Sequence, residues 1–297
     1  MHSLIVLIFL VEDGNFLTEI VGVGIVRRED QDTMDWIMSS FKKHHHNNFQ
    51  IIKYFMSDKN QTQRQAVKKI CPNIVLLICL YHTIQIWKRQ LSKMNLSSKQ
   101  KEFYLDELKK LAYAENINIY EYRLREMVKE CPECILSYFF QNWDDIKLQW
   151  TCYNEHHGTF YNRTNNRTES INQKLKQVID KMNKMSNPLQ AVTHFFTWKN
   201  FHDNENKRKI MRNFGSILQR EQSEDEKKYM NYLMDGPGEI VLNEIKNKNY
   251  ITFDNDNQNN TIFTIAKSKR ETTYKECNCT ISIAYKLPCR HIFAAHI

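Results

Sequence analysis

Cysteine and histidine residues near the end of the chain form two short pairs. Cys277 and Cys279 are separated by one residue, and after nine intervening residues Cys289 and His291 repeat that spacing. Thiolate and imidazole groups are the ligands that structural zinc sites arrange in a tetrahedron. Two buried cysteines beside an unrelated pair are the alternative, but four ligand-type residues within fifteen positions favour one metal site. The pattern therefore predicts one bound Zn²⁺.

The segments around these four residues must hold them in place. Strand-like runs at 250–253 and 261–266 lead into the first pair, which indicates a hairpin. The apolar segment Ile292–Ala295 follows the last ligand and favours a short helix. We therefore expect a small zinc finger, made of a β-hairpin and a helix, over residues 239–297.

Two acidic residues further upstream are candidates for a different chemistry. Asp58 follows the apolar run 51–56, and Glu169 lies at the start of a helix-like segment, 168–182. Carboxylates from separate elements can hold two divalent ions for phosphodiester cleavage, and Mg²⁺ suits carboxylate oxygens. The alternative is a solvated acid at a strand end and a first-turn acid stabilised by the helix dipole. From the residues alone, that alternative is the stronger.

The first ninety residues alternate apolar strand-like runs with amphipathic helices. Leu4–Val11 and Glu19–Val26 flank an Asp-Gly-Asn turn and predict a hairpin. Later elements are a helix opened by Glu29 and Asp30, a strand at 51–56, a helix at 61–70, a strand at 74–78 and a helix through Trp87. This order predicts an α/β fold with a mixed sheet.

The middle of the chain has only helical patterns. They extend from 97 to 150, continue at 168–182 and 189–202, and end in a charged helix at 204–230. The run Asp235-Gly236-Pro237-Gly238 is typical of a boundary. We therefore predict a domain at 1–203 with a helical insertion at about 97–160, a charged helix and linker at 204–238, and the zinc finger.

The C-x-C and C-x-H pairs resemble the SWIM zinc finger of Mutator-like (MULE) transposases and their domesticated relatives. Asp58, in the segment 55–59, resembles the second acidic residue of that family's catalytic triad. Cys79-Leu80-Tyr81-His82 is similar to its C-x-x-H segment, and Trp143 and Trp150 fall where its helical insertion carries tryptophans.

A further segment, Thr164–Asn172, resembles the family's T-N-N-x-x-E-S-x-N motif, which implies that Glu169 is the third acid. Among the relatives, the chain looks most like the SWIM-domain-containing zinc-finger proteins. The resemblance implies an RNase H-like domain followed by the zinc finger.

The same resemblance implies a first catalytic Asp on a first, central strand, and this chain matches from the second strand onward. Asp13 lies in a turn and Asp30 at a helix start, so neither fits that position. We therefore expect a truncated product or a fragment that lacks this strand and does not cut DNA. Mg²⁺ would be needed only in a longer product with a complete triad.

Other groups have weaker patterns. Cys131-Pro132-Glu133-Cys134 has no second pair nearby and is more often structural than metal-binding or redox-active. His44-His45-His46 favours a solvated helix end. Cys79 and His82 fit a metal site and a buried packing pair about equally well.

Composition limits the function classes. Hydrophobic residues make up 41% of the 297 residues, which excludes wholesale disorder, and the net charge of +8 suits a phosphate backbone. Thiolate ligands require a reducing compartment, and the early apolar run is too short to span a membrane.

We therefore predict an intracellular, nuclear, catalytically inactive zinc protein that binds DNA, a protein partner or both, with no membrane or small-molecule ligand. The alternatives are an active DDE-type transposase or nuclease whose first Asp lies on a missing N-terminal segment, and a protein-interaction scaffold.

Overall fold

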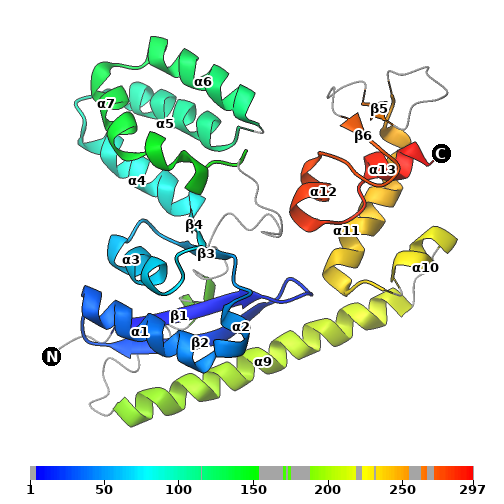
Figure 1. The fold of residues 1–297 in the computed structure, drawn as a ribbon, viewed down its shortest axis with the longest axis horizontal. Helices are drawn as coiled ribbons and strands as arrows, with labels where there is room; N and C mark the ends of the chain where they lie inside the picture. The colour runs from blue at the N-terminus through cyan, green and yellow to red at the C-terminus, as the bar shows by residue number, and fades with distance from the viewer. Residues whose placement is uncertain are drawn as a thin grey trace. The chain divides into compact units, whose positions relative to one another are not determined.

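The computed structural model describes most of the chain, in the ranges 5–114, 116–153, 170–171, 173–174, 188–218, 223–230, 232–253, 262–265 and 271–296. These residues form helices and three two-stranded sheets (Figure 1). The chain divides into two compact units. One gathers Met1–Leu7, Gly22–Glu155 and Asn162–Ser170, and the other gathers Ile8–Val21, His156–Tyr161 and Ile171–Ile297.

The predicted N-terminal hairpin is confirmed. Strands β1 (Ile5–Glu12) and β2 (Thr18–Val26) pair with each other. Asp13 closes the turn between them, because its Oδ1 accepts the backbone N–H groups of Asn15 at 2.9 Å and Leu17 at 2.8 Å. Such local bonds from an aspartate side chain stabilise turns, as the Asp-Gly-Asn sequence predicts.

The first unit contains a parallel pair of strands, β3 (Tyr54–Ser57) and β4 (Val75–Ile78). Helices α1 (Gln31–His44) and α3 (Gln61–Ile70) pack against each other, and their N-caps Asp30 and Asn60 accept backbone N–H groups of the first turn. The bounds of α3 are those predicted. The strand predicted from Ile51 begins later, because the short helix α2 (His46–Phe49) precedes it and Ile51 is 72% exposed.

The expectation of one mixed sheet is wrong for the described residues. The hairpin and the β3–β4 pair form separate two-stranded sheets. Among the described strands, neither of these pairs is hydrogen-bonded to the other, so each is a sheet of its own.

The predicted helical region follows β4. It consists of α5 (Ser98–Ala112), α6 (Ile117–Glu130), α7 (Glu133–Asn142) and the 3-10 helix η1 (Asp144–Gln149). The helix predicted through Trp87 is α4 (Leu80–Lys93), which shares one apolar core with them. Trp87, Trp143 and Trp150 lie at its centre, at most 3% exposed, with ring centroids 5.3–6.0 Å apart. Trp143 and Trp150, which the resemblance placed in the helical insertion, are therefore part of its buried core.

The second unit begins, among the described helices, with the long helix α9 (Pro188–Leu218), which α10 (Glu224–Met230) follows. The sequence suggested that one helix ends near 202 and a charged helix follows, but α9 continues without a break. The predicted domain boundary after residue 203 therefore falls inside it. None of the described helices combines the length and the apolar character needed to cross a membrane.

The run predicted as a linker, 235–238, is instead the first turn of α11 (Asp235–Lys246). Pro237 is tolerated there because N–H groups of the first turn have no acceptor within the helix. The glycines permit close packing: a Cβ on Gly236 would lie 2.4 Å from Cδ2 of Phe16, and one on Gly238 would lie 2.9 Å from Sδ of Met230. These glycines are thus packing residues.

The outer end of the hairpin is an integral part of the second unit. The carbonyl of Thr18 accepts Nδ2 of Asn206 at 3.1 Å, and the same amide donates to Oε1 of Glu19 at 3.0 Å. The Phe16 ring also meets Tyr285 edge to face, with centroids 5.9 Å apart.

The remaining elements surround the cysteine cluster. They are η2 (Lys248–Tyr250), β5 (Phe263–Thr264), β6 (Glu271–Thr272), α12 (Thr280–Tyr285) and α13 (Arg290–Ala295). In the described residues of the strand-like runs at 250–253 and 261–266, the structure shows the two-residue strand β5 and the bridge between Phe253 and Ile265. The predicted C-terminal helix is confirmed as α13.

Candidate metal centre

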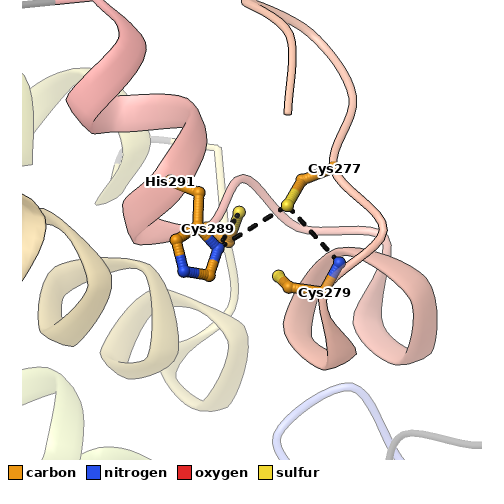
Figure 2. A group of neighbouring side chains, drawn as sticks. All are labelled: Cys277, Cys279, Cys289 and His291. Carbon is orange, nitrogen blue, oxygen red and sulfur yellow. Dashed lines mark hydrogen bonds between the residues drawn. The ribbon is translucent and has the colours of Figure 1, made fainter. Parts of the chain in front are cut away.

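Three short elements deliver the four predicted ligands. A bridge between Thr272 and Cys277 places the first cysteine at the end of the turn that follows β6. Cys279 is the N-cap of α12 and Cys289 is the N-cap of α13, while His291 lies in the first turn of α13. Figure 2 shows the ring nitrogen of His291 and the sulfurs of Cys277 and Cys289 turned toward one another.

The spacing of the ligand atoms fits a tetrahedral zinc ion. All four ligand atoms lie within 4.8 Å of one another. Nδ1 of His291 is 3.6 Å from Sγ of Cys277 and 3.7 Å from Sγ of Cys289. Zinc bonds of about 2.3 Å to sulfur and about 2.0 Å to nitrogen, at tetrahedral angles, put sulfur and nitrogen about 3.6 Å apart. The structure thus brings together the four residues that the spacing predicted.

A small apolar cluster surrounds the ligands. Cys277, Cys279 and Cys289 are buried together with Ile292, and Ile281 packs against them. Among the described residues, the three cysteines therefore make up most of this cluster.

The electrostatics of the cluster favour a shared negative charge. Hydrogen bonds from the thiols of Cys279 and Cys289 lower the pKa of the Cys277 thiol, and the same sharing raises the pKa of Cys289. Burial acts to lower the pKa of His291, but the sulfurs of Cys277 and Cys279 together raise it to about 9. Because zinc binds thiolates and neutral imidazole, metal uptake should release protons from this cluster.

A buried carboxylate on α11 pairs with the arginine that lies between two of the ligands in the sequence. Glu244 on α11 is 2% exposed and accepts three hydrogen bonds from Arg290, the residue between Cys289 and His291. Burial acts to raise the pKa of Glu244, but the bonds from Arg290 lower it below its usual value. Sequence reasoning missed this pair: the position of Arg290 between two ligands was a signal, but nothing near Glu244 pointed to the cluster.

The predicted acidic residues cannot be compared with each other. Asp58 is exposed just after β3, and its Oδ1 accepts the backbone N–H of Asn60 at 3.1 Å. Glu169 lies outside the described residues, so the place of the two carboxylates in one acidic triad stays a prediction. Cys79, the buried N-cap of α4, joins the same edge of the strands because its N–H donates to the Ser57 carbonyl at 2.9 Å.

The weaker candidates do not add a second metal centre. Across the described ranges, three or more possible metal ligands gather only at the C-terminal cluster. Cys131 is buried at the end of α6, where burial raises its pKa to about 12, whereas Cys134 is exposed. At the end of α1, the His44 ring meets the Ser40 carbonyl at 2.8 Å.

The comparisons with known proteins concern the N-terminal part. Residues 1–77 match the family model of the RNaseH-like domain of zinc finger SWIM domain-containing protein 1/3. This segment is an RNase H-like domain. The match reaches from the hairpin into β4 and includes Asp58, and it supports the relationship to SWIM-domain zinc-finger proteins that the C-terminal spacing suggested. No curated protein matches the chain.

Proposed function

We propose that this chain is a zinc-binding SWIM-type protein, derived from a MULE transposase, that acts by binding DNA or a protein partner in the nucleus. The observation that carries the proposal is the convergence of Cys277, Cys279, Cys289 and His291, within 4.8 Å, in a chain whose N-terminal segment is RNase H-like. Zinc would be structural, because four protein ligands leave no position for a reacting water.

The proposal includes a domain that does not cleave nucleic acid. Two-metal cleavage needs several carboxylates that hold both ions about 3.5–4 Å apart. Asp58 is exposed after β3, and in the described structure its Oδ1 receives a backbone N–H. One carboxylate with a second from Glu169 would hold an ion only loosely, and positioning is what such catalysis requires.

Positive charge supports weak binding to nucleic acid. The net charge is +8, and exposed cations include Lys88 and Arg89 on α4 and a group on α9: Lys207, Arg208, Lys209 and Arg212. Two further arginines, Arg163 and Arg167, lie outside the described residues. Binding through such residues is independent of base sequence and weakens steeply with salt, because it depends on counterion release.

One preparation of the chain tests these points together. Zinc content is measured, then strand cleavage with Mg²⁺ or Mn²⁺, then binding to duplex DNA over a salt titration. We expect one zinc per chain, no cleavage, and binding that falls as salt rises. Metal-dependent cleavage that Asp58→Asn abolishes would favour an active nuclease instead. Zinc uptake without DNA binding at low salt would favour the protein-interaction scaffold.

A further inference from the structure

Helix α13 and its N-cap residue supply two of the four ligands, but the helix forms few stabilising hydrogen bonds of its own. It is six residues long, from Arg290 to Ala295, and its N-cap Cys289 makes no side-chain cap hydrogen bond. The sulfur of Cys289 faces the other ligands instead, 3.7 Å from Nδ1 of His291. The backbone N–H of Arg290, the first residue of α13, has no acceptor within the helix and needs one from elsewhere in the fold.

Glu244 provides that acceptor from α11. Its Oε2 accepts the backbone N–H of Arg290 at 2.9 Å and Nε of the same residue at 3.0 Å, and its Oε1 accepts Nη2 at 2.5 Å. One carboxylate thus accepts hydrogen bonds from both the backbone and the side chain of Arg290. Two-point attachment fixes the rotation of α13 about its axis as well as its position.

Rotation matters because Arg290 lies between the two ligands. Successive residues of a helix point about 100° apart, so a slip of one residue would turn His291 away from the sulfurs. A glutamate at 2% exposure is also costly to bury, and its cost is offset only where charge and hydrogen bonds are satisfied. Arg290 satisfies both oxygens of this carboxylate.

We propose that Glu244 is a positioning residue of the metal centre: it orients the first turn of α13 so that Cys289 and His291 are in place to bind zinc. This inference rests on the proposed zinc site and adds to it a residue 33 positions before the first ligand. Residues outside the ligand set that orient metal ligands typically change metal affinity by about 10–100-fold when they are removed.

The test uses the full chain with Glu244→Ala, Glu244→Gln and, as a matched control, Glu239→Gln on the exposed face of α11. Zinc affinity is measured by competition with a chromophoric chelator, and Co²⁺ absorption reports the thiolate geometry. We expect Glu244→Ala to lower zinc affinity by about 10–100-fold and to alter the Co²⁺ spectrum. Glu244→Gln should lose several-fold, because its amide oxygen still accepts the Arg290 N–H, and Glu239→Gln should match wild type.

A purely structural role gives a different result. If Glu244→Ala lowers the thermal stability of the metal-free and metal-loaded chains equally, with zinc affinity and the Co²⁺ spectrum unchanged, the inference is overturned. If Glu244→Ala does not fold, an unchanged affinity in Glu244→Gln overturns it as well. A wild-type chain that takes up neither Zn²⁺ nor Co²⁺ would refute the zinc site itself, which separates the failure of the proposed function from the failure of this inference.

Discussion

Replacing Cys279 with serine tests how strongly the C-terminal fold depends on metal. The change is small, because serine keeps the shape of the side chain and leaves the Cys279 backbone N–H in place, which donates to Sγ of Cys277 at 3.4 Å. Only the thiolate ligand is lost. We expect zinc binding to weaken and the segment 271–296 to lose its order.

The size of this effect depends on the other interactions that stabilise the segment 271–296. Helices α12 and α13 have six residues each, and isolated helices below about 12–15 residues are marginal in water. Besides the cysteines, the cluster buries Ile292 and part of Ile281, worth at most about 3 kcal/mol each. Structural zinc contributes about 10–16 kcal/mol in small domains, so the metal is the larger source of stability.

Removing a zinc ligand should lower zinc affinity more than removing a residue that only orients a ligand, which costs up to about 100-fold. We therefore expect zinc affinity to fall by more than about 100-fold. That corresponds to more than about 2.7 kcal/mol of binding free energy. The assay is zinc content and chelator competition on the full chain, with hydrogen exchange over 271–296. Cys134→Ser, at an exposed cysteine in the first unit, is the control and should behave as wild type. Unchanged zinc content and exchange in Cys279→Ser would refute the reasoning.

Two further predictions concern the first unit. Trp150→Ala should destabilise the helical region by about 3–5 kcal/mol, because the ring is buried, whereas Trp36→Ala at 64% exposure should cost far less; urea unfolding followed by circular dichroism compares them, and equal effects would contradict the packing argument. Hydrogen bonds from the Thr33 hydroxyl and backbone N–H lower the pKa of Asp30. The ionised carboxylate therefore contributes to the free energy of unfolding above its ordinary pKa, and this contribution is lost as the pH falls through the lowered pKa. Asp30→Asn keeps the cap, so its stability should decrease less than that of wild type between pH 5 and about pH 2.5, as urea midpoints would show; parallel curves would exclude a role for this charge.

Local signals in the sequence determined several elements closely. Asp30 marked the start of α1 in the sequence because its short side chain accepts a first-turn N–H group, and the bounds predicted for α3 are those observed. The zinc ligands could also be predicted from the sequence. They form two pairs, each with one residue between its members, and the ligand chemistry depends only on the residue types.

Only the tertiary structure decided the contacts between distant segments. The glycines at 236 and 238 were predicted to lie in a linker, but they lie in the first turn of α11, where Phe16 and Met230 occupy the space that a side chain would need. Two helices were predicted where the structure has the single helix α9. The change in composition along the segment suggested a boundary, but the helical hydrogen bonding continues through it.

The Glu244–Arg290 pair shows the same limit at the metal centre. Its members are 46 residues apart, and neither has a neighbour that predicts the other. Caps, turns and ligand spacing act over a few residues and therefore appear in the sequence as patterns. Which buried carboxylate meets which helix depends on how α11 and α13 pack, and that is settled by the whole set of apolar contacts in the unit.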